Sequence, residues 1–297
     1  WPTWGGKAPA GPPNENLPFL IPGHSSYRRI ENFEFKKDDV FVSTWPKSGT
    51  TWMQQIVWQL RNKGVPVEKD ISYLVPYVEA RAIRPDEEQT DISKMESPRS
   101  FKTHFPLSFY PFARANCVKE NPLNVKFIYV IRSPEKVVSS FYRYVNQFPG
   151  LFENEGADMN LAARLFCEGH LFYGSYFDHI NDAWQQRGLP NVLVVKFEDL
   201  LSDRLPQLRR IATFLDISLT DEEMKRVVLY TGHEYMHKNS NYFSGLEYTE
   251  KLVGKDLEDT FSLVRGKDEK RDDLSDESLH LLRQTFQSKC SKLLNCD

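Results

Sequence analysis

A short run of charged and hydroxyl side chains, TWPKSGTTW, has the composition of a loop that binds a phosphate. Its chemistry comes from one cation, one glycine and three hydroxyl donors: Lys47, Gly49, Ser48, Thr50 and Thr51. An apolar stretch precedes the run and a helix-like pattern follows it. Successive backbone N–H groups at a helix N-terminus would there form an anion site. In isolation, the run is equally typical of a helix start that is capped by serine and threonine.

The order of these residues differs from that of the nucleotide triphosphatase loop, GxxxxGK[ST]. The lysine stands before the glycine, and Thr44 occupies the place of the first glycine of that loop. A later apolar run, VKFIYVIRSP, ends in Arg132 and not in an aspartate that could hold Mg²⁺. The loop therefore suits a phosphate but lacks the usual metal partners, which argues against a P-loop nucleotide kinase.

The elements that would position this loop follow from hydrophobic periodicity. Apolar runs rich in β-branched and aromatic residues predict buried strands at Val40–Val42, Phe127–Ile131 and Val192–Val195. Helical patterns are found at Trp52–Asn62, Pro134–Val145, Leu205–Leu215, Thr220–Tyr230 and Leu279–Leu294. Thr220 and Glu223 have the spacing of a capping box. The alternation predicts an α/β fold with a central parallel β-sheet flanked by helices, in which ligands bind beyond the carboxyl ends of the strands.

Length and composition favour one large domain. The 297 residues are 40% hydrophobic, and no linker divides the middle of the chain. Residues 1–18, rich in glycine and proline, predict an extended N-terminal arm before a domain at 19–297. The net charge of −3 gives no global field for nucleic acid. No apolar run is long enough to span a membrane.

The four cysteines, Cys117, Cys167, Cys290 and Cys296, form no CxxC pair. Their spacing argues against a structural metal and against a disulfide scaffold. A reducing compartment, the cytoplasm, is the simplest interpretation.

Two further segments, SFKTHFPLSFYP and FIYVIRSPEKVVSSFYRY, together with TWPKSGTTW resemble the cytosolic sulfotransferase family. The segments LVPYVEAR, LFYGSYFDHINDAW and VKFEDLLSD also match, and the resemblance runs from about Asp38 to the C-terminal helix. Such enzymes move a sulfuryl group from 3′-phosphoadenosine 5′-phosphosulfate (PAPS) to a hydroxyl or amine, without a metal. The loop would then be a P-loop-like site for the phosphosulfate. A Golgi-type carbohydrate enzyme stays open only if a membrane anchor precedes this chain.

The resemblance implies a catalytic set of four residues: His104, Lys47, Lys102 and Ser140. His104 would be the general base, a role that suits imidazole because it titrates near neutrality. Lys47 would neutralise the leaving oxygen. On a strand, Lys102 and His104 would face the same side, with Lys102 on the sulfuryl oxygens. The alternative for His104 is a core histidine with satisfied hydrogen bonds.

Cofactor contacts beyond the loop are also implied by the resemblance. Arg132 and Ser140 match the residues that bind the 3′-phosphate, and a guanidinium can hold a phosphate through two hydrogen bonds. Alternatively, Arg132 is a surface residue that forms a salt bridge. Trp52 matches the aromatic that stacks on adenine, although it could also simply pack at the helix start. The remaining implied contacts are Phe197, Thr231, Met236, Arg265, Gly266 and Lys267.

Two departures from the family pattern bear on the cofactor. The family commonly has tyrosine where this chain has Phe197, which cannot donate a hydrogen bond. Near the C-terminus the chain reads LVRGKDEKRDDLSDE, so the usual order of the loop over the 3′-phosphate is changed. We expect weakened PAPS binding, and a non-catalytic nucleotide- or ligand-binding protein stays open as an alternative function.

By resemblance, an acceptor pocket is lined by aromatic or small residues: Phe19, Tyr77, Ala80, Phe105 and Tyr144. These side chains suit a flat, hydrophobic hydroxyl compound such as a phenol, a steroid or another alcohol. The polar segment 84–98 is a candidate lid. The dimer motif of the family is not visible in the sequence, so a homodimer is possible but not indicated.

Overall fold

The computed structural model describes residues 33–79, 92–113, 121–146, 158–171, 173–244 and 274–294. Within these ranges a four-stranded sheet has the order β2-β1-β3-β4, and all neighbouring strands are parallel. The strands are β1 (Val40–Ser43), β2 (Ser100–Thr103), β3 (Lys126–Ile131) and β4 (Val192–Lys196). The predicted α/β fold with a central parallel sheet is therefore confirmed. Outside the described residues lie the arm, most of the predicted lid, Phe19, Ala80, Arg265, Gly266 and Lys267.

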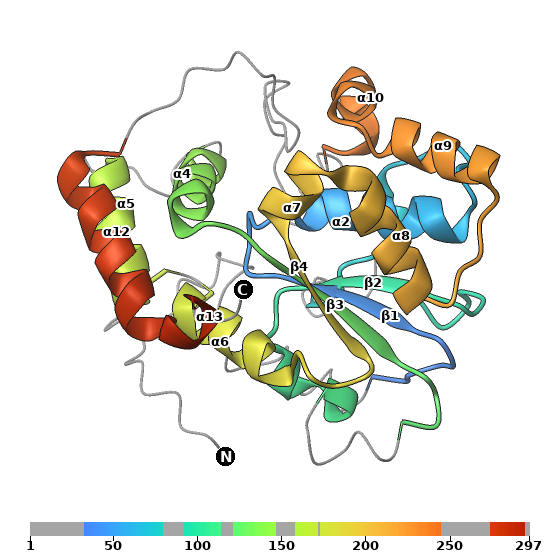
Figure 1. Cartoon of the computed structure of the whole chain (residues 1–297), viewed down its shortest axis with the longest axis horizontal. Coiled ribbons are helices and arrows are strands. Elements are labelled where there is room, and N and C mark those ends of the chain that lie inside the picture. Colours follow the sequence, from blue (N-terminus) through green and yellow to red (C-terminus); the bar gives the residue numbers. More distant parts are fainter. Residues whose placement is uncertain are drawn as a thin grey trace.

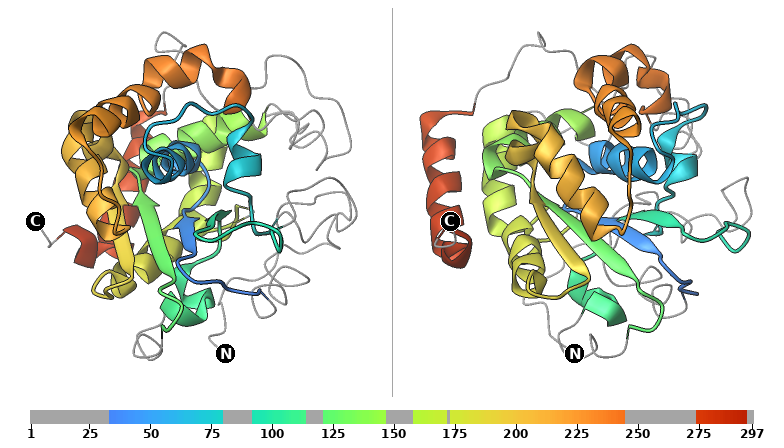
Figure 2. Two further views of the ribbon diagram at one scale, coloured as in Figure 1. Left: turned by 90° about the vertical axis from the view of Figure 1, so that its right-hand side faces the viewer. Right: turned by 45° about the vertical axis from the view of Figure 1, so that its right-hand side comes forward.

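Helices cover both faces of this sheet (Figures 1 and 2). One face is covered by α2 (Thr50–Arg61), α8 (Arg204–Phe214) and α9 (Asp221–Tyr230). The other is covered by α4 (Pro134–Val145), α5 (Met159–Glu168), α6 (Tyr176–Gln186) and α12 (Asp276–Lys289). Shorter elements are α3 (Ile71–Leu74), α7 (Phe197–Ser202), α10 (His233–Lys238), α13 (Ser291–Leu294) and the 3₁₀ turns Leu107–Phe109, Pro111–Ala113 and Ser240–Tyr242.

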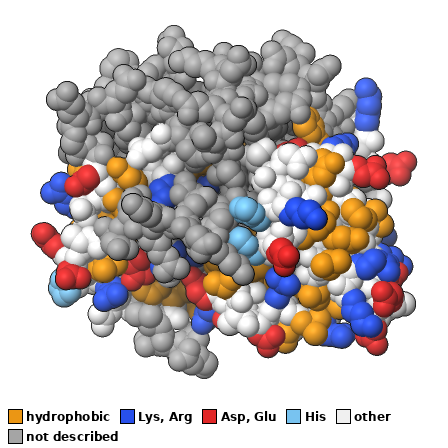
Figure 3. Space-filling model, turned by 90° about the horizontal axis from the view of Figure 1, so that it is seen from above, with side chains coloured by type: hydrophobic (Ala, Val, Ile, Leu, Met, Phe, Trp, Pro, Cys, Tyr) orange, Lys and Arg blue, Asp and Glu red, His pale blue; other side chains and the backbone are white. Residues whose placement is uncertain are grey.

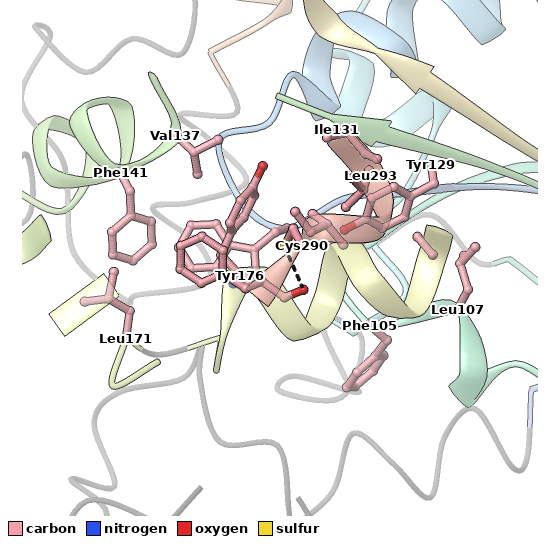
Figure 4. Packing of buried hydrophobic residues seen from close by; sticks show 14 of the residues in the cluster. Phe105, Leu107, Tyr129, Ile131, Val137, Phe141, Leu171, Tyr176, Cys290 and Leu293 are labelled. Carbon is pink, nitrogen blue, oxygen red and sulfur yellow. Dashed lines mark hydrogen bonds between the residues drawn. The ribbon is translucent and has the colours of Figure 1, made fainter. Parts of the chain in front are cut away.

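Side chains alternate between the two faces along the strands, as period two requires. Phe127, Tyr129 and Ile131 of β3 enter the core beneath α4, α5, α6 and α12, whereas Ile128 and Val130 enter the core beneath α2, α8 and α9. Figure 4 shows the first of these cores, where side chains of β3, α4, α6 and the C-terminal segment meet. Because both faces are buried, the strands read as continuous apolar runs, which is how the sequence revealed them.

The helix predictions hold with small shifts at the ends. Helix α4 has the predicted bounds, and the capping box at the start of α9 is formed by Thr220 and Glu223. The single C-terminal helix predicted at Leu279–Leu294 is wrong, because α12 ends before Cys290 and α13 begins after it. Two helices on the α4 side, α5 and α6, and the short strand β2 were not predicted from periodicity.

A buried ion pair closes the amino ends of β1 and β2. Arg99 donates from Nε to Oδ1 of Asp39 at 2.8 Å and from Nη2 to Oδ2 at 2.5 Å, and the two side chains are 2% and 0% exposed. The remaining donors of Arg99 reach the carbonyls of Glu34 and Ile92, and the backbone N–H of Lys36 donates to Asp39. Each nitrogen of the guanidinium and each oxygen of the carboxylate thus has a hydrogen-bond partner.

The described part of the surface above the sheet carries charges of both signs (Figure 3). Acidic and basic side chains are interspersed over the described part of this face (Figure 3). In the described ranges, no helix has the length and apolar character needed to cross a bilayer.

Candidate active site

The TWPKSGTTW loop leaves the carboxyl end of β1 and leads directly into α2, which begins at Thr50, two residues earlier than predicted. Its N-cap is Gly49, and no side chain caps the helix. The interpretation of the run as a serine- and threonine-capped helix start is therefore wrong. Ser48 Oγ is buried without a hydrogen-bond partner in the described part of the chain, while the hydroxyls of Thr44 and Thr50 bond each other at 2.6 Å.

Two residues of the loop have left-handed backbone conformations. Lys47 has φ 68° and Gly49 has φ 105°, and such values in residues other than glycine are uncommon and cost energy. A Cβ on Gly49 would lie 2.5 Å from the Phe197 ring. Arg132, which follows β3, donates from Nη1 to the Lys47 carbonyl at 2.9 Å and so fixes the turn. The loop is a tight backbone concavity held from the neighbouring strand.

Arg132 itself is held between the loop and an aromatic ring. Its guanidinium carbon lies 4.3 Å from the centroid of the Phe197 ring. Burial lowers the pKa of Arg132, and Glu198 opposes that shift. Its Nε is buried and has no partner among the described residues. A surface salt bridge does not describe this side chain, which keeps a donor available for an anion.

His104 follows the last residue of β2 and is 8% exposed. Its Nδ1 lies 2.8 Å from the Thr44 carbonyl oxygen. Because a carbonyl oxygen only accepts hydrogen bonds, Nδ1 carries the proton and Nε2 keeps its lone pair. Burial first, and the charge of Lys102 next, lower the pKa of His104 well below its ordinary value. The imidazole is therefore neutral near pH 7 and can accept a proton at Nε2.

Two lysines and two tyrosines surround this histidine. Lys47 Nζ lies 4.4 Å from the ring centroid of Tyr144, and Lys102 Nζ lies 4.6 Å from that of Tyr77. The His104 ring lies 5.2 Å from the Tyr77 ring. Lys102 and His104 thus both lie against Tyr77, although β2 ends between them. Burial lowers the pKa of Lys102 to about 8, which Glu79 and Asp70 oppose.

The residues expected near adenine gather beside the loop. Trp52 donates from Nε1 to the Thr231 carbonyl at 2.8 Å, and its ring lies edge-on to Phe197 at 5.2 Å. Met236 is buried in a small cluster that Trp52 also contacts. Ser140 lies on α4 one turn before Tyr144, so both project from one side of that helix. Phe105 is buried next to His104.

Three residues without an expected role also touch this centre: Glu79, Tyr173 and His179. Glu79 accepts a hydrogen bond from the His104 N–H at 2.6 Å, and His179 Nε2 donates to the His104 carbonyl at 2.9 Å. The Tyr173 ring lies 5.3 Å from the His104 ring. The sequence carried one signal, a single carboxylate at the end of the apolar segment LVPYVE. Among the described residues, no group of three or more His, Cys, Asp or Glu lies close enough together to hold a metal.

Fold and site together define a parallel α/β protein in which a tight loop, a buried histidine and two lysines lie at the carboxyl edge of the sheet. A model of the sulfotransferase domain matches residues 37–293. Mouse sulfotransferase 1B1 is 33% identical over 227 residues, which are 72% of this chain and 70% of that protein. Human sulfotransferase 1E1 is 30% identical over 221 residues, 72% and 71% of the two chains. The chain belongs to the sulfotransferase family, which confirms the resemblance and the prediction of a sulfotransferase enzyme.

Solved structures share the fold. Retinol dehydratase in complex with androsterone and the inactive cofactor PAP superposes with a TM-score of 0.67 at 24% identity, covering 89% of this chain and 85% of that one. A mouse sulfotransferase complexed with PAP gives a TM-score of 0.66 at 22% identity, covering 90% of both chains.

Proposed function

We propose that this chain transfers the sulfuryl group of PAPS to a hydroxyl, or an amine, of a small and mostly hydrophobic acceptor. The observation that carries the proposal is the meeting of a neutral imidazole, with its lone pair on Nε2, and two lysines at the carboxyl edge of the sheet. Lys47 and Lys102 both contribute to the lowered pKa of His104, so both charges lie close to that ring. A base and two cations at one point suit the transfer of an anionic group.

The loop residues fit the cofactor. Ser48 Oγ and Arg132 Nε are buried polar atoms without partners among the described residues, and the uncapped start of α2 presents backbone N–H groups. Such groups are costly to bury unless a ligand satisfies them. The two structural relatives that are complexed with PAP, the product 3′-phosphoadenosine 5′-phosphate, support the same ligand here. When bound, PAPS supplies the activated sulfuryl group and a phosphate as leaving group.

The reacting residues have separate tasks in this proposal. His104 Nε2 takes the proton of the acceptor hydroxyl, while the Thr44 carbonyl keeps the ring in the required tautomer. Lys47 stabilises the negative charge that develops on the leaving phosphate oxygen. Lys102 neutralises the sulfuryl oxygens, and Ser140 lies on the adjoining face of α4.

The rest of the cofactor would lie against the residues beside the loop. Arg132 and Ser140 would hold the 3′-phosphate, and Trp52 and Phe197 would pack against adenine. The other proposed contacts are Gly49, Thr50, Thr51, Thr231 and Met236 in the described part, with Arg265, Gly266 and Lys267 outside it.

The acceptor would bind between aromatic walls. Tyr77 and Tyr144 already contact the two lysines, and Phe105 follows the base. Phe19 and Ala80 would complete the pocket. Flat aromatic surfaces favour a phenol, a steroid or another hydrophobic alcohol. The androsterone complex of a structural relative supports the steroid class.

The test has a binding arm and a turnover arm. We expect PAP to raise the melting temperature of the protein by linkage, and ATP with Mg²⁺ to raise it less. We then expect transfer of radiolabelled sulfate from PAPS to at least one member of a panel of phenols, steroids and alcohols. Stabilisation by ATP with Mg²⁺ alone would exclude the proposal. A PAP shift without turnover on any acceptor would favour a non-catalytic binding protein.

A further inference from the structure

A buried carboxylate lies behind the proposed base and has no part in the steps above. Glu79 is 8% exposed. It lies two residues after Tyr77, whose backbone forms a parallel β-bridge with Lys102 of β2. Its Oε1 accepts from the backbone N–H groups of His104 at 2.6 Å and Phe105 at 3.0 Å. The carboxylate thus holds the backbone of the base at the point where β2 ends.

A second set of contacts fixes the carboxylate itself. Tyr110 donates from its hydroxyl to Thr103 Oγ1 at 2.6 Å, and Thr103 donates to Glu79 Oε1 at 2.6 Å. Three donors therefore converge on one oxygen, while Oε2 is buried with no partner among the described residues. A carboxylate that served only to satisfy neighbouring donors would use both oxygens.

The charge of Glu79 acts on Lys102. Burial raises the pKa of Glu79 to about 7, while its hydrogen bonds and Lys102 oppose the shift. Burial lowers the pKa of Lys102 to about 8, and Glu79 is the largest influence that raises it, ahead of Asp70. Near pH 8, Glu79 is an anion and helps Lys102 to stay a cation. Other described titratable groups beside this pair include His104, Tyr110 and Tyr77, whose ring centroid lies 4.6 Å from Lys102 Nζ.

We propose that Glu79 is a positioning residue for sulfuryl transfer, which orients His104 through its backbone N–H and maintains the positive charge of Lys102. The inference rests on the proposed function. Displacement of a reacting group by about 1 Å can cost a hundredfold in rate, and loss of a cation at the sulfuryl oxygens removes transition-state stabilisation. Glu79 thus serves both reacting side chains of the Lys102–His104 segment without touching the substrate.

The variants separate geometry from charge. Glu79→Gln keeps an acceptor at Oε1 and removes the charge, so we expect the high-pH limb of kcat, which Lys102 sets, to move to lower pH. Glu79→Asp keeps the charge, so we expect the high-pH limb of its kcat profile to lie closer to that of the wild type than the limb of Glu79→Gln does. Its shorter side chain should nevertheless lower kcat. Glu79→Ala removes the acceptor, and we expect kcat to fall about 10- to 100-fold with the KM for PAPS little changed.

Tyr110→Phe is the matched control, because it removes a hydrogen bond from the same buried cluster and keeps both the Glu79 carboxylate and the bond that it accepts from Thr103. We expect it to lower the melting temperature without moving the high-pH limb. The proposal is overturned if Glu79→Gln retains both the kcat and the high-pH limb of the wild type, or if Tyr110→Phe moves that limb as far as Glu79→Gln does. It is also overturned if Glu79→Gln loses both activity and the PAP-induced rise in melting temperature, because Glu79 would then be required for folding in general. Failure of the proposed function is distinct, since the wild type itself would then transfer no sulfate.

Discussion

The two ends of the β1–β2 strand pair each hold a buried carboxylate, and their surroundings differ. At the amino ends, Asp39 uses both oxygens on Arg99, and the arginine donors that remain reach backbone carbonyls. At the carboxyl ends, Glu79 receives three donors on one oxygen and none from the described residues on the other. Ser48 Oγ and Arg132 Nε at this same edge are also buried without described partners.

This difference in hydrogen bonding indicates which edge of the sheet has polar atoms available for a ligand. A saturated buried pair stabilises one conformation and offers nothing to a substrate. Buried polar donors without partners are destabilising by themselves, so an anion that accepted from Ser48 Oγ and Arg132 Nε would remove a cost at the carboxyl edge. The amino edge is therefore expected to govern stability and the carboxyl edge to govern binding and rate.

The largest effect should come from His104→Ala at the carboxyl edge. With no base to accept the acceptor's proton, we expect kcat to fall by about 10²–10⁴-fold, while the PAP-induced rise in melting temperature remains. Exposed His170, which contacts Glu168, provides the control: His170→Ala should leave kcat unchanged. Turnover near the wild-type rate in His104→Ala would show that another group is the base.

At the amino edge, Arg99→Leu should destabilise the protein without slowing the reaction. The substitution leaves the Asp39 carboxylate buried without its partner, which costs about 3–5 kcal/mol of unfolding free energy. Denaturant unfolding measures this loss, and kcat is measured well below the melting temperature. Arg283→Leu removes an exposed partner of Glu135 and should cost only about 0–1 kcal/mol. A large fall in kcat for Arg99→Leu would contradict the expectation that the amino edge governs stability alone.

In the loop, Gly49→Ala tests the cradle directly. The new Cβ would meet the Phe197 ring at 2.5 Å on a backbone with φ 105°, and such strain costs about 1–3 kcal/mol. We expect the PAP-induced rise in melting temperature to shrink or disappear. Gly188→Ala is the control, because nothing lies within 4 Å of its Cβ and its φ is not positive. An unchanged PAP shift in Gly49→Ala would mean that the loop does not hold the phosphate.

Much of this arrangement could be predicted from local patterns. Strands β1, β3 and β4 are apolar because both faces are buried, and helix α4 is marked by Ser133 and Pro134. Strand β2 was not predicted from periodicity because three of its four residues are polar: Ser100, Lys102 and Thr103. The role of Glu79 could not be predicted, because its partners follow 24 to 26 residues later and meet it only when β2 is in place. The turn at Lys47, whose φ is positive, likewise accepts a hydrogen bond from Arg132, which follows β3 and lies 85 residues away in the sequence.

The smallest effect, and the finest test of the carboxyl edge, comes from Phe197→Tyr. The Phe197 ring lies between Arg132 and Trp52, and phenylalanine offers no hydrogen-bond donor there. The tyrosine hydroxyl restores the donor that relatives commonly have. A neutral hydrogen bond is worth about 0.5–1.5 kcal/mol, so we expect PAP affinity to rise about 2- to 12-fold in a calorimetric titration.

Phe214 gives the matched comparison at the other edge. Lys126 is the first residue of β3, and its Nζ lies 5.7 Å from the centroid of the Phe214 ring. Phe214 therefore also packs against a cation, but at the amino end of the sheet. Phe214→Tyr adds the same hydroxyl far from the loop and should leave PAP affinity unchanged. Equal changes in the two variants would mean that the added hydroxyl acts through general polarity. A gain confined to Phe197→Tyr would place the adenosine at the carboxyl edge, beside the unpartnered donors Ser48 Oγ and Arg132 Nε.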